Sequence, residues 1–367
     1  MQAQAYAPGR VELLGNHTDY NEGLVLAAAI DRGVKVSGVR RSDQRIALRS
    51  SSLGEFEIGC DDIRPQKEPA WVNYPLGVVR ELREAGIEVD GFSAEIESDL
   101  PFGCGLSSSA ALEVATAFFL LQLFEAVLPP IQIARLCQRA EHRFVGVQSG
   151  LLDQVTSIFG RANHAVFFDA RSEEVRPIPF PPGLALVIAE SGEKRALAAG
   201  LYNQRREETA SAAAALGLGA LRDISPNELA RRDLPPLLRR RAAHIVGENA
   251  RVARALELLA QNDGGGFGTL MNESHESSRV NFENSTAELD RLVEMARDLP
   301  GVLGARLTGG GFGGATVTLC ESAAAAQIAE ELAQACRKNF GREARVFVCA
   351  LANGAQIWHG AQPGYLP

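Results

Sequence analysis

A stretch near the middle of the chain, Pro101-Phe-Gly-Cys-Gly-Leu-Ser-Ser-Ser-Ala-Ala111, constrains the fold more than any other. Gly103 and Gly105 allow backbone N–H groups to point inward, because glycine has no Cβ to block them. Three serines, Ser107 to Ser109, then lead into an apolar run that predicts a buried helix, with a positive dipole and unpaired N–H groups at its start. Such a loop favours a bound anion, although no Gly-Lys-[Ser/Thr] of a Walker A loop follows it. Taken alone, it also fits a glycine-rich turn before a capped helix.

Size and composition set the broad class. At 367 residues the chain is long for one core, which favours two domains. Hydrophobic residues make up 46% and charged residues 22%, as in soluble globular proteins. The net charge of −8 argues against nucleic acid or an anionic membrane surface as a partner, so a phosphate site must be built locally.

We expect a cytoplasmic monomer. The N-terminus lacks the basic and apolar regions of an export signal, and no apolar run is long enough to span a membrane. The six cysteines form no CxxC pair, which favours buried thiols in a reducing compartment over disulfides.

The N-terminal half is predicted to mix strands and helices. Apolar and β-branched segments predict strands over 11–14, 25–30, 34–39, 45–48, 55–58, 92–97 and 165–168. Helical spacing predicts helices over 73–86, 110–124, 131–145 and 150–160. Four prolines within 177–182 predict a linker, and the domains are therefore expected to be 1–178 and 179–367.

The second half continues this mixture. Strands are expected over 184–189, 305–307, 315–319 and 344–350, and helices over 194–216, 235–261, around 271–275, 287–298 and 323–336. Strands and helices mix without strict βαβ order, which favours an α+β fold with antiparallel or mixed sheets. The final residues are free to pack back on the first domain.

Three motifs occur together in this order: Pro8-Gly-Arg10, the glycine–serine loop, and Leu307-Thr-Gly-Gly-Gly-Phe-Gly-Gly314. Together they resemble the GHMP kinases, which include galactokinase, homoserine kinase, mevalonate kinase and phosphomevalonate kinase. Within them the chain most resembles galactokinases over nearly its whole length, notably in Gly9-Arg-Val-Glu-Leu-Leu-Gly-Asn-His-Thr-Asp-Tyr-Asn-Glu-Gly23. The resemblance implies a ribosomal-S5-like N-terminal domain and a ferredoxin-like C-terminal domain. It also implies transfer of the ATP γ-phosphate to the C1 hydroxyl of galactose.

The resemblance implies catalytic and metal-binding residues. Asp153 would take the proton of the C1 hydroxyl or orient that hydroxyl, and Arg10 would stabilise the transition state. Ser109 and Glu141 would hold Mg²⁺ together with nucleotide oxygens and water. Without the family motifs, Asp153 would read as a carboxylate favoured by a helix dipole, and Ser109 as a helix cap. Some galactokinase-like chains bind sugar without turnover, but this chain keeps Asp153, Arg10 and all three serines.

The resemblance also assigns the nucleotide site. ATP would lie on the glycine–serine loop, covered by the late glycine motif from the second domain. The residues concerned are Gly103, Cys104, Gly105, Leu106, Ser107, Ser108, Ser109, Gly309, Gly310 and Gly311.

The sugar would be bound by Asn16, His17, Thr18, Asp19 and Tyr202, since polar groups that pair with specific hydroxyls discriminate well. One position departs from the family. Galactokinases usually carry Glu where this chain has Asn16, at the spot that contacts the 6-hydroxyl of the sugar. Asparagine still forms hydrogen bonds, so galactose is the first expectation. Loss of a negative charge makes galacturonate or an amino sugar the alternative substrate.

Overall fold

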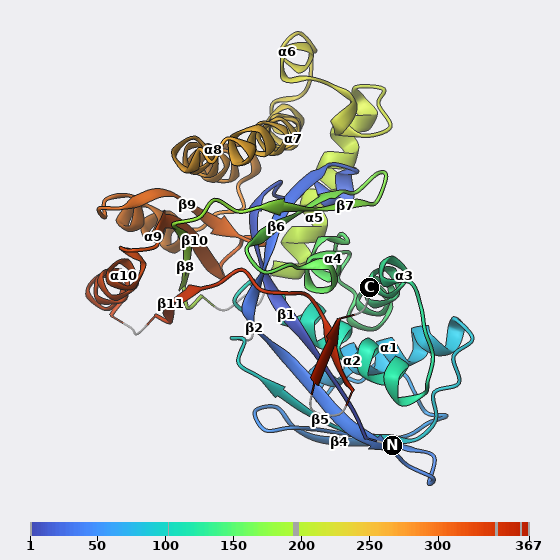
Figure 1. Ribbon diagram of the computed structural model, residues 1–367. Helices are drawn as coiled ribbons and strands as arrows, with labels where there is room; N and C mark the ends of the chain where they lie inside the picture. The colour runs from blue at the N-terminus through green and yellow to red at the C-terminus, as the bar shows by residue number, and fades with distance from the viewer. Residues whose placement is uncertain (1, 102, 194–197, 342–343, 360–361, 366–367) are drawn as a thin grey trace.

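The computed structural model describes residues 2–101, 103–193, 198–341, 344–359 and 362–365, which form an α+β fold with two sheets (Figure 1). The larger sheet has the order β13-β12-β1-β2-β5-β3-β4, with β6 paired to β2 and β7 to β6. Its strands are β1 (Gln2–Leu14), β2 (Leu24–Arg40), β3 (Arg45–Ser50), β4 (Gly54–Gly59), β5 (Phe92–Ser98), β6 (His164–Asp169), β7 (Glu174–Pro179), β12 (Gln356–His359) and β13 (Gln362–Tyr365). Strands β3 and β5 run parallel while β1 and β2 run antiparallel, so the sheet is mixed as predicted.

Strand β2 corrects the prediction of two separate strands. It runs without a break from Leu24 to Arg40 beside β1, pairing first with β6 and then with β5 on its other side. The polar residues near Asp31 suggested a break. They lie instead at a register shift, between the pairs Arg10–Ala29 and Pro8–Gly33, where the exposed Asp31 bulges without ending the strand.

Strand β7 corrects the linker predicted from the prolines. Pro177 and Pro179 lie within β7, which pairs antiparallel with β6. Proline has no backbone N–H to donate to a β-ladder. An edge strand such as β7 forms hydrogen bonds with a neighbouring strand on one side only, so it can accommodate proline. The chain crosses to the second sheet between β7 and β8 (Leu184–Glu190), and the domain boundary at residue 178 stays a prediction.

Four helices cover the larger sheet near the glycine–serine loop. They are α1 (Asn73–Glu84), α2 (Ser108–Leu123), α3 (Pro130–Ala140) and α4 (Leu152–Phe159). Helix α2 packs on β1 and β2, and α1, α3 and α4 pack on α2. Because α2 is enclosed on all sides, nearly all its residues are buried, as its apolar sequence predicts. The helix predicted over 131–145 changes into a π-helical turn, Glu141–Val145, after α3.

The second sheet separates two packing layers. Its strands β8, β9 (Val302–Thr308), β10 (Ala315–Glu321) and β11 (Val346–Cys349) are antiparallel in the order β11-β8-β10-β9. Alternate residues of a strand face opposite ways. Leu186 and Ile188 of β8 therefore join the main core with α8 (Gly264–Ser277). Val187 and Ala189 pack instead with α9 (Ala287–Arg297) and α10 (Ala325–Phe340).

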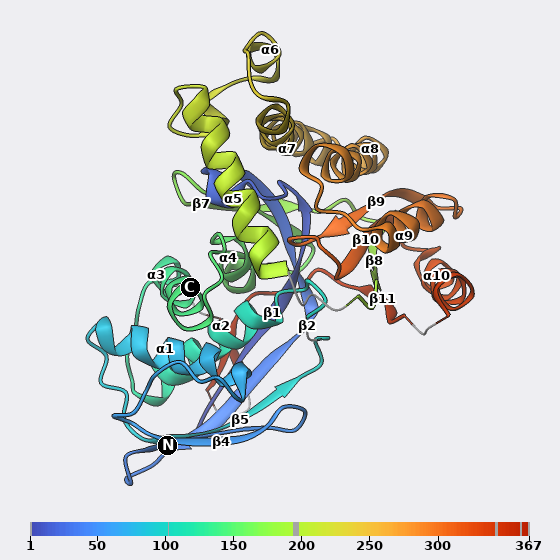
Figure 2. The ribbon, with the colours of Figure 1, turned by 180° about the vertical axis from the view of Figure 1, so that it is seen from behind.

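The remaining helices lie between β8 and β9 in the chain. They are α5 (Ala198–Ala215), α6 (Pro226–Leu229) and α7 (Pro236–Ala260). Helix α7 packs against α5, α8 and β2, and Figure 2 shows α5 running from the α6–α7 end toward α4. The sequence did not predict α6, β12 or β13, and the start expected for α5, 194–197, lies outside the described residues.

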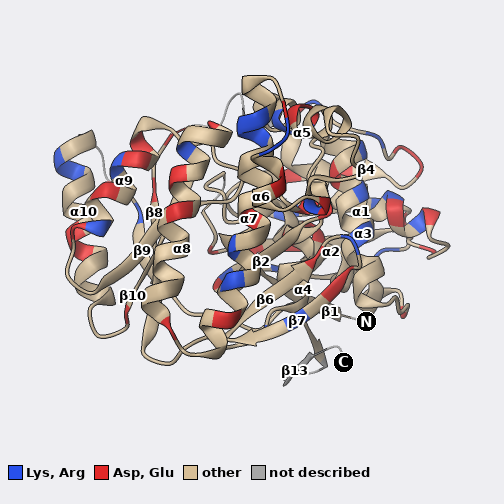
Figure 3. Ribbon diagram, turned by 90° about the horizontal axis from the view of Figure 1, so that it is seen from above, with Lys and Arg blue, Asp and Glu red and all other residues tan. Residues whose placement is uncertain are grey.

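Two further observations concern the helices. No helix in the described part of the chain is both long and apolar enough to cross a membrane. Acidic and basic side chains are interspersed along α9 and α10 (Figure 3).

Candidate active site

A cavity of about 370 Å³ lies where β1, the glycine–serine loop, α4, α5 and the β9–β10 loop meet. Most of the predicted site residues line it: Arg10, Asn16, His17, Asp19, Gly103, Gly105, Ser107, Ser108, Ser109, Glu141, Asp153, Tyr202, Gly310 and Gly311. Four predicted residues, Thr18, Cys104, Leu106 and Gly309, do not line it. The cavity therefore collects segments from both sheets into one polar site.

The glycine–serine loop reaches the cavity through left-handed backbone. Gly103, Gly105 and Ser107 have φ values of 76°, 79° and 58°. The expected serine cap does not form: Ser107 makes no side-chain bond to the first turn of α2, which begins at Ser108. Its hydroxyl donates instead to Oδ2 of Asp153, 2.5 Å away. The energetic cost of the left-handed conformation of Ser107 is thus offset by its hydrogen bond to Asp153.

Arg10 and Asp153 form the centre of the cavity. Arg10 lies on β1 and Asp153 in the first turn of α4, where the helix dipole favours a carboxylate. Nη2 of Arg10 lies 2.5 Å from Oδ1 of Asp153, and Nε donates to the same oxygen over 2.8 Å. Nη1 of Arg10 donates to the carbonyl oxygen of Gly105 over 2.7 Å. The Arg10 guanidinium thus links the loop to the carboxylate, and Arg10 is only 5% exposed.

Glu141 is a buried carboxyl beside the loop serines. Its pKa is raised to about 7, mainly by burial and also by the charge of nearby Asp153, while hydrogen bonds from Ser149, Gln154 and Ser109 oppose the increase. The predicted pair, Ser109 and Glu141, thus lies within hydrogen-bond reach. Among the described residues no group of three His, Cys, Asp or Glu is arranged to hold a metal ion. One carboxylate and one hydroxyl fit Mg²⁺, which keeps several waters and nucleotide oxygens as ligands.

Asp19 is held close to Gly150, which lies just before α4. A Cβ on Gly150 would lie 1.8 Å from Oδ2 of Asp19, so only glycine leaves room for that carboxylate. Burial raises the pKa of Asp19 to about 7, with further contributions from the charges of Asp153 and Glu12. The backbone N–H groups of Tyr20 and Leu152 hydrogen-bond to Asp19 and oppose this increase. A hydroxyl-rich ligand would supply the donors that such a carboxylate lacks.

His17 belongs to a ring cluster over the cavity. Its ring centroid lies 4.8 Å from that of Tyr202 and 4.6 Å from that of Phe282. Nε2 lies 3.0 Å from the carbonyl oxygen of Gly310, and Nδ1 lies 2.7 Å from the hydroxyl of Tyr20. Burial lowers the pKa of His17 to about 3, so the ring is neutral and donates from Nε2.

Asn16 and Thr18 are fully buried in the turn after β1. The amide of Asn16 bonds to four protein groups, with Nδ2 donating to Glu12 and to the carbonyl oxygen of Gly309. The hydroxyl of Thr18 lies 2.7 Å from the carbonyl oxygens of both Gly15 and Leu24. Thr18 therefore holds the turn rather than facing the cavity.

Helix α7 supports this turn from the second half of the chain. Oε2 of Glu248 accepts from the N–H groups of Gly15 and Asn16 over 2.8 and 2.9 Å, and Arg251 donates to its Oε1 over 2.7 Å. Burial opposes ionisation of Glu248. The charges of Arg251, His244 and Arg306 outweigh it and hold the pKa of Glu248 well below its usual range.

The cavity also contains residues that the sequence did not single out, among them Glu12, Tyr74, Ser149 and Phe312. A signal existed for Glu12, because residues two apart on a strand share a face and Arg10 was already a candidate. Phe312 lies within the late glycine motif, which was already expected to cover the site.

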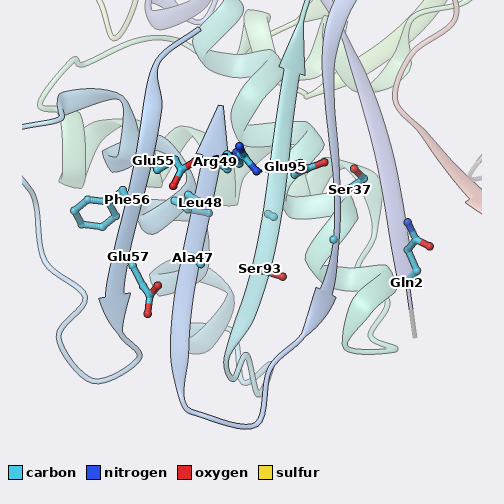
Figure 4. A pocket seen from close by; sticks show the side chains of 12 residues that line it. Gln2, Ser37, Ala47, Leu48, Arg49, Glu55, Phe56, Glu57, Ser93 and Glu95 are labelled. Atoms are coloured by element: carbon cyan, nitrogen blue, oxygen red, sulfur yellow. Dashed lines mark ion pairs between the residues drawn. The ribbon is translucent and has the colours of Figure 1, made fainter. Parts of the chain in front are cut away.

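A larger hollow of about 540 Å³ lies on the outer face of the large sheet, where Figure 4 shows side chains from β1, β2, β3, β4 and β5. Its charged groups include Arg49 and Glu55, an ion pair at 2.9 Å with both side chains more than half exposed. It shares no lining residue with the polar cavity and contains none of the predicted site residues. A solvent-exposed pair contributes little binding energy, so the polar cavity is the better candidate site.

The sequence and the fold both match known kinases. Family models described as the GHMP kinases N terminal domain, the GHMP kinases C terminal and the galactokinase galactose-binding signature match residues 73–161, 255–338 and 2–39. Galactokinase of Roseiflexus sp. strain RS-1 is 43% identical over 97% of this chain and 93% of its own. Human galactokinase is 41% identical over 96% and 91%.

A crystal structure of Lactococcus lactis galactokinase complexed with galactose superposes with a TM-score of 0.92 at 32% identity, covering 96% of this chain and 94% of that one. The resemblance seen in the sequence is therefore confirmed, together with the two-domain GHMP kinase fold. The chain belongs to the galactokinases of the GHMP kinase family.

Proposed function

We propose that this chain transfers the γ-phosphate of ATP to the C1 hydroxyl of galactose, giving galactose 1-phosphate and ADP. Full-length similarity to galactokinases and a fold close to that of a galactose-bound one support this activity. The main observation behind the proposal is the Arg10–Asp153 pair. It lies in one cavity with the glycine–serine loop and the turn after β1.

Asp153 receives the hydroxyl proton in this proposal. Its carboxylate accepts a hydrogen bond from the C1 hydroxyl and takes that proton as the new P–O bond forms. Arg10 is paired with this carboxylate and offsets negative charge that develops between the sugar oxygen and the phosphate. Ser107 holds the second oxygen of Asp153 and so fixes the orientation of the carboxylate.

The phosphates lie on the glycine–serine loop, with N–H groups at the start of α2 beneath them. Ser109 and Glu141 hold Mg²⁺, which would neutralise phosphate charge. Gly310 and Gly311 line the cavity from the opposite sheet and bring backbone close to the substrates. Burial and the nearby charge of Asp153 both raise the pKa of Glu141. A bound cation would offset both effects and keep Glu141 ionised, which supports a cation at this place.

The sugar lies between Asp19, the ring cluster and Asp153. Asp19 accepts from sugar hydroxyls, and the neutral rings of His17 and Tyr202 pack against the apolar parts of the sugar. The galactokinase relatives favour galactose over the galacturonate or amino-sugar alternative. The proposed site is complete within one chain, so a monomer would suffice for the reaction. The abundance of ATP in the cytoplasm supports a cytoplasmic location.

The test is a sugar panel with the purified chain. ADP release is measured with ATP, Mg²⁺ and galactose, glucose, galacturonate or galactosamine. We expect the highest kcat/KM with galactose and a product phosphorylated at C1. A higher kcat/KM with galacturonate, or no turnover of any sugar, would contradict the proposal.

A further inference from the structure

Asn16, in the turn after β1, has no free hydrogen-bonding capacity. Its Oδ1 accepts from Asn284 over 2.9 Å and from Ser278 over 3.4 Å. Its Nδ2 donates to Oε1 of Glu12 over 2.8 Å and to the carbonyl oxygen of Gly309 over 2.9 Å. Both neighbours of Nδ2 are acceptors, so the amide orientation is fixed. Asn16 is also fully buried. Its amide therefore holds neighbouring protein groups in position and is not a ligand of the sugar.

Glu12 supplies the carboxylate that position 16 lacks. Its side chain lines the same cavity. Among the described residues, the hydrogen bonds to this carboxylate come from Asn16 and from Nη2 of Arg306, at 2.8 and 3.0 Å, and both end on Oε1. Two donors thus fix the carboxylate through one oxygen. The other oxygen, Oε2, is left to accept a hydrogen bond from a ligand.

The placement of Glu12 suits one end of a hexose. Arg10 and Glu12 lie two residues apart on β1, about 7 Å along the strand, and share a face. Arg10 marks the end where Asp153 meets the C1 hydroxyl. Glu12 therefore lies one sugar length away, toward the end that carries the C6 group.

Charge at this end is balanced by Arg306. The Arg306 side chain is fully buried, is paired with Glu12 and does not line the cavity. Glu12 therefore stands between the arginine and the ligand. A hydroxymethyl group can donate to Oε2, whereas a carboxylate in its place meets another carboxylate and cannot donate.

We propose that Glu12 is the specificity-determining residue for the C6 group. Its Oε2 accepts from the 6-hydroxyl of galactose and excludes uronic acids. Asn16 holds Glu12 in place through its amide. This inference rests on the proposed function, and it removes the reason to expect galacturonate from the Asn16 departure.

The test compares galactose, 6-deoxygalactose and galacturonate in the wild type and in Glu12→Gln. The two donors to Oε1 orient the glutamine amide, so Nε2 replaces Oε2 and the acceptor becomes a donor. Wild type should prefer galactose to 6-deoxygalactose by at least about tenfold in kcat/KM. In Glu12→Gln that preference should shrink, and kcat/KM for galacturonate relative to galactose should rise about tenfold or more. Unchanged ratios in a variant with wild-type Tm overturn the proposal.

Glu12→Gln also removes the charged partner of Arg306, and a second variant controls for this loss. Glu12→Asn combined with Asn16→Glu keeps one carboxylate and one amide in the pair. We expect it to retain the selectivity for galactose over galacturonate and over 6-deoxygalactose. A folded exchange variant that loses this selectivity overturns the proposal. Absence of galactose turnover by the wild type would instead refute the proposed function, so the two failures are distinguishable.

Discussion

The guanidinium of Arg10 is bonded at once to Asp153 and to the loop that precedes α2, through Nε to Oδ1 at 2.8 Å and through Nη1 to the carbonyl oxygen of Gly105 at 2.7 Å. One buried cation therefore sets the distance between the proposed base and the proposed phosphate site. Phosphoryl transfer depends mainly on such positioning and on charge neutralisation.

Gly150→Ala should weaken galactose binding. The new Cβ would fall 1.8 Å from Oδ2 of Asp19 and displace that carboxylate from its bonds. We expect the KM for galactose to rise about tenfold, at the low end of the cost of a lost charged hydrogen bond, with the KM for ATP little changed. Steady-state kinetics measures both. Gly219→Ala is the control, since its Cβ would meet only one atom, 4.0 Å away. An unchanged galactose KM in Gly150→Ala would argue against Asp19 as a sugar ligand.

The magnesium requirement should depend on pH through Glu141. Burial raises the pKa of Glu141 to about 7 without a cation, and a carboxyl must be ionised to bind a metal. The half-saturating Mg²⁺ concentration should therefore be about tenfold higher at pH 6 than at pH 8. Rates are titrated with Mg²⁺ at fixed ATP. Glu141→Gln removes this group, and a variant with the wild-type pH dependence would assign that dependence to ATP itself.

Glu248→Gln should destabilise the fold, because Glu248 holds the N–H groups of Gly15 and Asn16 from inside the protein. Loss of one partner of a buried charge pair costs about 3 kcal/mol, measured by urea unfolding at pH 7. Glu257→Gln on the same helix removes an exposed ion pair with Arg254 and should cost less than about 1 kcal/mol. Equal losses in the two variants would contradict the role assigned to Glu248.

The Glu248 contribution also has a predicted pH dependence. Its pKa is lower in the folded state than in the unfolded state, so the folded protein binds fewer protons on this group. The resulting stability is complete above the ordinary pKa of about 4.5 and falls by about 1.4 kcal/mol per pH unit below it. The stability difference between wild type and Glu248→Gln should therefore be constant from pH 6 to 8 and shrink toward pH 3.5. A difference that grows in acid would reverse the sign of this assignment.

The fold was predictable from sequence where local pattern decides it. The apolar run after the serines predicts a buried helix, and α2 is one. The pattern failed where tertiary pairing decides: the polar residues near Asp31 lie in a bulge, and the prolines of β7 lie on an edge strand. Neither outcome is visible without the neighbouring strand.

The site was predictable as a set of motifs but not as a set of contacts. Most predicted residues line one cavity, because each family motif supplies one of its walls. The sequence could not reveal that Asn16 is saturated, since its partners Ser278 and Asn284 lie more than 260 residues away. A separation of more than 230 residues likewise hid Glu248, which supports the turn from α7.

The most direct test of the account is the rate of galactose 1-phosphate formation by Asp153→Asn. Asparagine keeps the size of the side chain and can still accept a hydrogen bond from Arg10, but it has no charge to pair with the guanidinium and cannot take the proton. We predict that kcat falls by about a hundredfold or more, whereas the Kd for galactose, measured by calorimetry, changes only a few-fold. A folded Asp153→Asn protein with near wild-type kcat would contradict the account.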